Sequence, residues 1–150
     1  MKVNFIRPGY TFGNPAIPGG FMQPDQRFVE IVKRALRGET ISIVKNDGTQ
    51  FIWADDISYV YANVLQSDFS KKTYFALSKE FVTWEQIARD AVALCNSSSR
   101  IELEDLGWSS NPTLFDVSNI KQDFNLEFHA YPHIINHLDA LKNIFKNKKE

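Results

Sequence analysis

One stretch decides the fold: Asp47-Gly48-Thr49-Gln50-Phe51-Ile52-Trp53-Ala54-Asp55-Asp56-Ile57. Its Asp-Gly dipeptide lies between two apolar runs, residues 41–44 and 51–54. Asp-Gly in that position indicates a β-hairpin, because glycine adopts a positive φ at no steric cost. We therefore predict two short strands joined by a tight turn.

A helix is predicted directly after this hairpin. Apolar residues recur there at the spacing i, i+3, i+4, i+7 and i+8, which places them on one helix face. They are Ile57, Val60, Tyr61, Val64 and Leu65. Asp55 and Asp56, which precede this stripe, have two interpretations: they cap the free amides at the positive end of the helix dipole, or they form an acid–base pair. Capping is the commoner role of adjacent carboxylates at a helix start, and we expect it here.

The remaining chain carries further strand and helix signals, as expected of an α/β protein. Strands are predicted over residues 2–6, 73–77 and 101–103, and helices over residues 26–37, 84–95, 116–123 and from Pro132 onward. Gly38 ends the first of these helices, and Thr83 with Gln86 forms a capping box at the next one. Residues 7–15 are rich in glycine and proline and predict a loop at the end of the first strand, where open α/β sheets bind ligands.

Composition bounds the class of protein. The 150 residues suit a single domain over residues 1–150. Seventeen basic and eighteen acidic residues give a net charge of −1, so no strong field favours nucleic acid or an anionic membrane as a partner. The sequence has no apolar run near the roughly 20 residues of a membrane span and no signal peptide. We expect a cytoplasmic, soluble domain.

The single cysteine and the three histidines are the candidate disulfide-forming and metal-binding residues of this sequence. Cys95 excludes an internal disulfide, favours a reducing compartment, and lies on an apolar helix stripe, so we expect a small buried hydrophobe. His129, His133 and His137 are spaced to share a helix face and bind a metal. Because Pro132 is expected to start that helix, His129 would lie outside it, and we predict no metal site.

Five segments, in this order, carry a family resemblance: IRPGYTFGNP (residues 6–15), FVEIVKRALRGETI (28–41), FIWADDI (51–57), TYFALSKEFVTWEQIA (73–88) and FDVSNIKQDFNL (115–126). They resemble the C-terminal, substrate-side half of the extended short-chain dehydrogenase/reductase family, which comprises NAD(P)-dependent sugar-nucleotide epimerases and dehydratases. The resemblance implies the C-terminal part of a Rossmann-like α/β fold, with small strands and several packed helices. It covers nearly the whole chain.

The resemblance also implies site residues. Pro8, Gly9 and Tyr10 would line the nicotinamide end of NAD or NADP. Phe21, Gln50 and Trp53 would face a small-molecule substrate, a sugar nucleotide or a related carbonyl compound.

Several positions depart from the family pattern. Trp53 replaces a histidine, Tyr10 and Phe75 replace asparagines, and Thr49 and Gln50 stand where the family has an arginine that clamps a diphosphate. We therefore expect a drier pocket, which puts a sugar nucleotide in doubt.

Two parts of the family's machinery are absent from this sequence. It contains no glycine-rich dinucleotide fingerprint, and no tyrosine is followed four residues later by lysine. We therefore assign no catalytic residue and expect that the chain is not catalytically competent alone. It would be a fragment, a truncated gene product, or a chain that works with a separate N-terminal, dinucleotide-binding half.

Two further expectations follow from this interpretation. The first strand would have an unpaired edge, so we predict that the chain forms a homo-oligomer or rearranges that strand. The alternative function is a non-enzymatic binding or assembly module that kept the fold and lost the chemistry.

Overall fold

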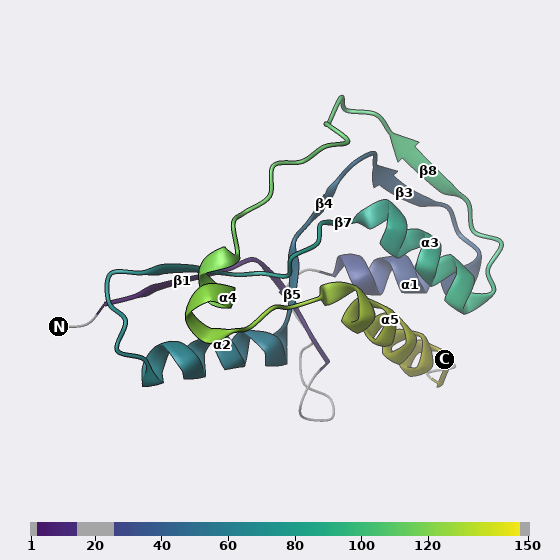
Figure 1. Cartoon of the computed structure of the whole chain (residues 1–150). Helices are drawn as coiled ribbons and strands as arrows, with labels where there is room; N and C mark the ends of the chain where they lie inside the picture. Colours follow the sequence, from purple (N-terminus) through teal and green to yellow (C-terminus); the bar gives the residue numbers. More distant parts are fainter. Residues whose placement is uncertain (1–2, 15–25, 148–150) are drawn as a thin grey trace. The chain divides into compact units, whose positions relative to one another are not determined.

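The computed structural model describes residues 3–14 and 26–147 and shows a mixed α/β protein (Figure 1). The strands are β1 (Phe5–Pro8), β2 (Tyr10–Phe12), β3 (Ile41–Val44), β4 (Gly48–Thr49), β5 (Phe51–Trp53), β6 (Thr73–Ala76), β7 (Val82–Thr83) and β8 (Ile101–Glu104). The helices are α1 (Arg27–Arg37), α2 (Ala54–Gln66), α3 (Trp84–Cys95), α4 (Ser118–Phe124) and α5 (Ala130–Asn147). Within the described residues, no helix is long and apolar enough to cross a membrane.

The chain divides into two compact units that are interleaved in sequence. Unit 1 comprises Met1–Gly13, Thr49–Phe81 and Pro112–Ala130, and unit 2 comprises Asn14–Gly48, Val82–Asn111 and Tyr131–Glu150. Each unit is described by itself below. The predicted single domain over residues 1–150 stays a prediction.

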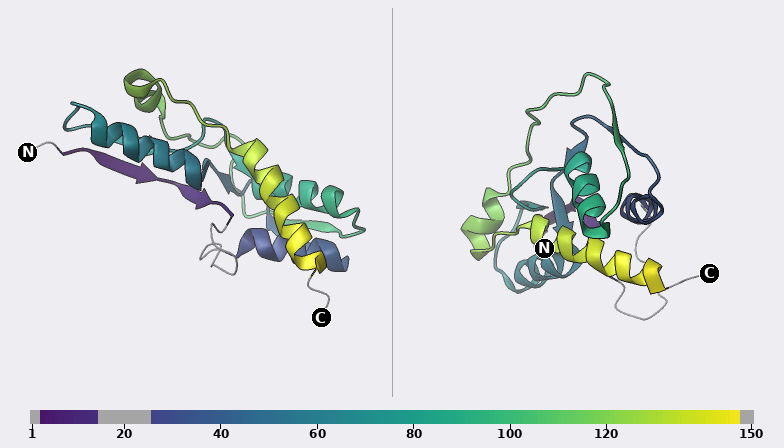
Figure 2. Two further views of the ribbon diagram at one scale, coloured as in Figure 1. Left: turned by 90° about the horizontal axis from the view of Figure 1, so that it is seen from below. Right: turned by 90° about the vertical axis from the view of Figure 1, so that its right-hand side faces the viewer.

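Unit 1 is built on two parallel strand pairs. β1 pairs with β6, so that Phe5 lies opposite Thr73 and Pro8 opposite Ala76. β2 pairs with β5, so that Tyr10 lies opposite Phe51. Figure 2 shows α2 running alongside the β1 segment. The core of this unit consists of Ile52, Val60, Tyr74, Ala76, Ile120 and Phe128.

Unit 2 is built on one parallel strand pair and three helices. β3 pairs with β8, with Ile41 opposite Ile101. The helix α3 packs against α1, β3 and β8, and α1 also contacts β3. Both helices bury their apolar stripes. The buried residues of α1 are Phe28, Val29, Ile31, Val32 and Ala35, and those of α3 are Trp84, Ile87, Ala88 and Ala91.

The predicted hairpin is wrong. The two strands that flank Asp47-Gly48 do not pair with each other, because β3 pairs with β8 and β5 pairs with β2. The turn after β3 is closed by a hydrogen bond from the Asp47 amide to the Val44 carbonyl, 3.1 Å. Its left-handed residue is Asn46, with φ of 63°, rather than Gly48. Asparagine tolerates that conformation, so the turn moves two residues upstream of the glycine.

The helix after β5 also differs from the prediction. It begins at Ala54, so Asp55 and Asp56 lie in its first turn, where they face the dipole, and the N-cap residue Trp53 makes no side-chain cap bond. Of the predicted apolar stripe only Val60 is fully buried, and Leu65 is 83% exposed.

The first strand was also misplaced, because residues 7–12, predicted as loop, continue as strand with a break at Gly9.

Two local signals, the helix stop at Gly38 and the helix cap at Thr83, were confirmed. Gly38 ends α1 in the left-handed conformation, with φ of 69°. The Thr83 hydroxyl caps α3 by accepting the Gln86 amide at 3.1 Å. Cys95 is half-buried at the end of α3, and burial raises the pKa of its thiol. The predicted start of the last helix at Pro132 was wrong: α5 begins at Ala130, two residues earlier, and Pro132 lies in its first turn, where a missing amide is tolerated.

Candidate functional site

The candidate site lies in unit 1, where the carboxyl ends of β1 and β6 meet. Ligands of open α/β sheets collect at this edge, because helix starts and loops follow the strands there. Pro8 ends β1 and is exposed, Gly9 follows it, and Tyr10 opens β2. The structure therefore places three predicted site residues at the edge expected for a ligand.

Gly9 is required by close packing within this edge. A Cβ atom built on Gly9 would lie 1.8 Å from Cδ2 of Leu77 and 3.1 Å from the carbonyl oxygen of Gln50. The Gly9 amide donates to the Ala76 carbonyl at 3.4 Å. The space beside Gly9 is thus filled by the Leu77 side chain, which would have to move to admit a Cβ atom, and the Gln50 carbonyl leaves little further room.

Gln50 links three segments of unit 1 through its buried amide group. The side chain is 4% exposed. Its Nε2 donates to the carbonyls of Ser78 at 3.0 Å and Phe115 at 3.2 Å, and its Oε1 accepts the Phe115 amide at 2.7 Å. These bonds fix the backbone at Phe115 against the end of β6. The predicted contact between Gln50 and a substrate stays a prediction.

An exposed aromatic surface sits on the segment that Gln50 fixes. The Phe115 ring, 58% exposed, stacks on Phe75 with centroids 5.0 Å apart and planes inclined by 27°. The Phe75 ring also contacts a cation: the Arg7 guanidinium carbon lies over it, 5.9 Å from the ring centroid. A flat, partly exposed ring pair beside a cation is suited to stacking with a planar ligand.

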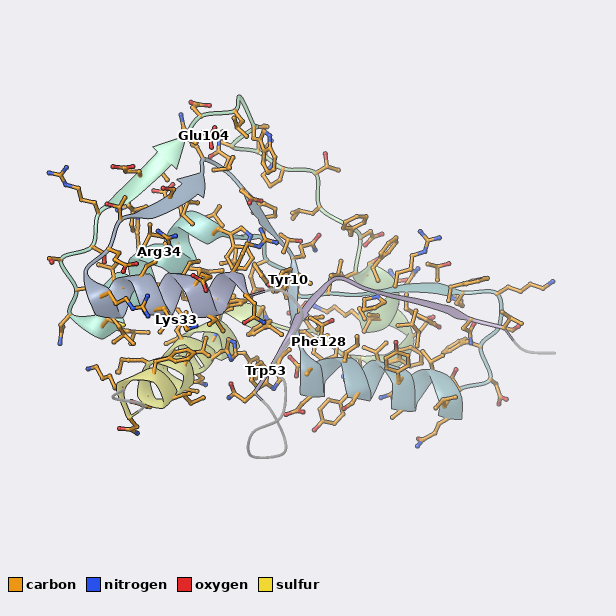
Figure 3. All side chains as sticks on the ribbon, turned by 180° about the vertical axis from the view of Figure 1, so that it is seen from behind. Tyr10, Lys33, Arg34, Trp53, Glu104 and Phe128 are labelled. Atoms are coloured by element: carbon orange, nitrogen blue, oxygen red, sulfur yellow. The ribbon has the colours of Figure 1, made fainter. Side chains whose placement is uncertain are left out.

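Trp53 closes the neighbouring strand pair. Its Nε1 donates to Asp55 Oδ2 at 3.2 Å, and its ring packs edge-on against Phe12 with centroids 5.2 Å apart. Tyr10 packs edge-on against Phe51 at 4.9 Å. Figure 3 labels Tyr10 and Trp53, which come from the adjacent strands β2 and β5. Phe21 lies outside the described residues.

A charged network links α4 to the first half of β6 and to Lys72, which precedes that strand. The Tyr74 hydroxyl donates to Asp123 Oδ2 at 2.9 Å, and Lys72 Nζ lies 3.1 Å from the same oxygen. Burial and the Asp123 hydrogen bond together raise the pKa of Tyr74 to about 12. Burial works to raise the pKa of Asp123, but the hydrogen bonds from Tyr74 and Lys72 outweigh it and lower that pKa. This network fixes α4 to β6 and is structural.

The three histidines have different surroundings. His129 lies between carboxylates, with Nδ1 3.2 Å from Glu80 and Nε2 3.5 Å from Glu127. His137 is buried in unit 2, where Nδ1 donates to Asn14 Oδ1 at 2.7 Å and burial lowers its pKa to about 4. His133 is half-buried. No group of three metal-ligating side chains occurs among residues 3–14 and 26–147.

Two features bear on whether these residues could hold a dinucleotide: the space beside Gly9 and the sequence around it. The Leu77 side chain occupies the space next to the Gly9 backbone. The sequence contains no glycine-rich turn that could hold a pyrophosphate. Pro8 and Tyr10 offer only an edge against which a ring could rest. The sequence thus lacks the turn that holds a pyrophosphate in dinucleotide-binding folds, and the expectation that the chain alone binds no dinucleotide stays a prediction.

Sequence reasoning missed the roles of Phe115 and Asp123. Phe115 was seen only as the first letter of the motif at residues 115–126, and Asp123 as part of a helical turn. Both act through partners about fifty to sixty-five positions away, Tyr74 for Asp123 and Gln50 for Phe115. The one available signal was a glutamine within an apolar strand run, because a buried amide requires hydrogen-bond partners.

Comparisons with known proteins show the fold. No known protein family and no curated protein matches the sequence. Solved structures match over the whole chain: the UDP-glucose 4-epimerase of Thermotoga maritima, solved with UDP-glucose, has a TM-score of 0.70 at 14% identity, covering 100% of this chain and 48% of that one.

Two further structures agree with it. The UDP-glucuronic acid 4-epimerase of Bacillus cereus, solved as a mutant with a fluorinated UDP-sugar and NAD, has a TM-score of 0.71 at 15% identity, covering 98% of this chain and 46% of that one. The dTDP-glucose 4,6-dehydratase of Bacillus anthracis, in complex with NAD, has a TM-score of 0.68 at 13% identity, covering 97% and 45%.

These likenesses confirm the predicted fold class. The chain has the α/β fold found in NAD-dependent sugar-nucleotide epimerases and dehydratases, and it spans about half the length of the solved structures it matches. At identities of 15% or less they show the fold alone.

Proposed function

We propose that this chain forms the substrate-side part of an NAD(P)-dependent epimerase or dehydratase of the extended short-chain dehydrogenase/reductase family. The order of five sequence motifs and the fold shared with such enzymes support this proposal. One observation carries it: the buried Gln50 amide holds Phe115 beside the carboxyl ends of β1 and β6. That edge is the ligand edge of an open α/β sheet.

Each site residue has a proposed role. Pro8, Gly9 and Tyr10 form the edge that the nicotinamide of NAD or NADP would pass, and Trp53 faces the substrate. Gln50 acts through the Phe115 backbone as a positioning residue as well as a substrate contact. Phe21 keeps its predicted substrate role.

The proposed substrate is a sugar nucleotide or a related carbonyl compound. The solved structures of like fold were determined with UDP-glucose or a fluorinated UDP-sugar, which makes such a compound the first probe. The sequence has neither the dinucleotide fingerprint nor a Tyr-x-x-x-Lys pair. Catalysis therefore requires a separate dinucleotide-binding half, supplied either in one longer chain or as a partner.

The test is a titration of the 150-residue chain, labelled with ¹⁵N, with UDP-glucose. We expect saturable shifts at the amides of Gly9, Tyr10 and Phe115 and at the Trp53 indole N–H. The Gln50→Leu variant should weaken binding, because it frees the Phe115 backbone. Thr113→Ala, on the exposed segment before Phe115, is the matched control and should bind as the parent chain does. Shifts elsewhere, or none, would contradict the proposal.

The second candidate is a non-enzymatic binding or assembly module. The missing fingerprint and Tyr-x-x-x-Lys pair favour it. The same titration separates the two, because a module that has lost the chemistry has no reason to retain a sugar-nucleotide site. Unperturbed spectra with UDP-glucose, together with a stable oligomer, would favour the module.

A further inference from the structure

Unit 1 contains a cavity on the side of β6 where α4 lies. Its volume is about 270 Å³. Its wall comes from three segments: Leu77 and Lys79 after β6, the start of α4, and residues 126–128. We propose that this cavity binds a small amphipathic carboxylate, such as a short fatty acid or an arylalkanoic acid. The proposal does not depend on the sugar-nucleotide function proposed above.

The floor of the cavity is apolar and firmly held. Its apolar residues are Leu77, Val117, Ile120, Leu126 and Phe128. Ile120 and Phe128 are 2% and 8% exposed and belong to the core of unit 1. The Lys79 amide donates to the Phe128 carbonyl at 3.1 Å, which ties two walls together. Figure 3 labels Phe128, on the segment between α4 and α5. A preformed apolar floor favours a hydrocarbon chain or a single ring.

The rim carries two lysines that share one carboxylate. Lys121 Nζ lies 2.8 Å and Lys79 Nζ 3.8 Å from Glu127 Oε2. The other oxygen of Glu127, Oε1, lies 3.5 Å from His129 Nε2. The hydrogen bond from Lys121 and the nearby cations outweigh the effect of burial and lower the pKa of Glu127. Glu127 is therefore ionised, and its Oε2 accepts a hydrogen bond from Lys121.

Asp116 is the other acid of the rim, and its acceptor capacity is also in use. Its Oδ1 accepts the Ser118 amide at 2.8 Å, and that hydrogen bond lowers its pKa. Each lysine ammonium, in contrast, has three N–H donors, and both lysine side chains are about 60% exposed. The two lysines and two ionised carboxylates of the rim sum to no net charge. What the rim offers an entering group is lysine N–H donors, which favour a ligand with a strong acceptor such as a carboxylate.

The size of the cavity limits the ligand. A volume of about 270 Å³ is slightly below the range of drug-sized sites, so the ligand has roughly ten non-hydrogen atoms. A carboxylate is small enough to lie between Lys79 and Lys121 beside Glu127, with its hydrocarbon part on the floor. A nucleotide is too large and too polar for this space.

The experiment uses three probes that differ only in the head group: 3-phenylpropanoate, 3-phenylpropanol and 3-phenylpropylamine. Each is titrated into the ¹⁵N-labelled chain, and binding is followed at the amides of residues 77–79, 117–121 and 126–128. We expect saturable shifts with the carboxylate and affinity roughly tenfold lower for the alcohol, because it loses the charge-assisted hydrogen bonds. The amine should bind most weakly.

Two variants keep the proposal falsifiable. Lys79→Gln combined with Lys121→Gln removes the two ammonium groups that would bind a carboxylate and should reduce the preference for carboxylate over alcohol to unity or below, while Lys45→Gln in unit 2 should leave it unchanged. Val117→Phe fills the cavity and should abolish binding of all three probes. Equal affinity for the three head groups, unchanged selectivity in the double variant, or shifts confined to other residues would overturn the proposal.

Discussion

Two helices that both follow a short strand, α2 in unit 1 and α3 in unit 2, differ in how they are held. The α3 helix has a Thr83 cap bond and buries four of its twelve residues. The α2 helix has no side-chain cap bond at Trp53 and buries only Val60 among thirteen residues. Both carry an apolar stripe in the sequence, so the stripe alone does not decide burial. The apolar side chains of α3 are packed inside unit 2, whereas several of those of α2 are exposed at the surface of unit 1.

The exposed apolar side chains of unit 1 lie on the elements that carry the candidate site and on α2. They are Val3, Phe5, Tyr59, Tyr61, Leu65, Phe69, Leu114 and Phe115. A groove of about 420 Å³ runs between the β1 segment and α2. Exposed apolar surface of this kind marks interaction sites. Unit 2 also exposes apolar side chains, at Leu103, Leu106, Trp108, Tyr131 and Ile144, so the contrast between the units lies in the helix stripes and not in exposed apolar surface as a whole.

The largest effect is expected in the core of unit 2. Phe28 is fully buried and its ring packs edge-on against Trp84 and His137, each with centroids 5.1 Å apart. Phe28→Ala should lower the free energy of unfolding by about 4 kcal/mol, through lost burial and the cavity left behind. Urea unfolding followed by circular dichroism measures it. A loss below 1 kcal/mol would contradict the claim that the buried helix faces hold unit 2 together.

Acid should weaken unit 2 through His137. Its pKa is about 4 in the folded chain, against an ordinary value of 6.5. The unfolded chain therefore binds more protons between these two values, and stability falls as pH drops from 6.5 toward 4, by about 3 kcal/mol in total. Urea unfolding at several pH values measures this slope. His137→Gln should flatten it, and an unchanged slope in that variant would assign the effect to other groups.

A smaller effect is expected at the buried tyrosine of unit 1. Tyr74→Phe removes the hydrogen bond to Asp123 and leaves that carboxylate with Lys72 alone, which should cost about 1–2 kcal/mol. The matched control is Tyr131→Phe in unit 2, whose hydroxyl donates to Asp90 at 2.9 Å on the surface and should contribute less than about 0.5 kcal/mol. Equal losses in the two variants would show that burial does not set the value of this bond.

The smallest effect on stability, and the most informative about partners, is expected on α2. Leu65→Ser changes a side chain that is 83% exposed, so the free energy of unfolding should change by less than about 0.5 kcal/mol. If unit 1 meets a second copy through this surface, the variant should shift the sedimentation profile toward monomer. A parent chain that is monomeric at high concentration would contradict the predicted self-association.

The sequence predicted local signals better than pairing. Gly38 and Thr83 were identified because a helix stop and a helix cap depend on one or two residues. The partner of β3 was missed because β8 lies about sixty residues later and parallel pairing leaves no local turn signal.

The same limit applied to the candidate site. Pro8, Gly9 and Tyr10 were placed at a strand end because the glycine- and proline-rich run is local. The expected contact between Gln50 and a substrate stays a prediction, and the sequence did not predict that its amide bonds to Ser78 and Phe115. Those partners depend on how distant segments pack, and neither spacing nor composition reports that packing.

The central claim is that this chain carries a substrate side without a dinucleotide site, and a paired calorimetric titration tests it most directly. The same preparation would be titrated with UDP-glucose and, separately, with NAD and NADP. The account predicts saturable heat with UDP-glucose and none with either dinucleotide. Binding of NAD or NADP with no response to UDP-glucose would contradict it.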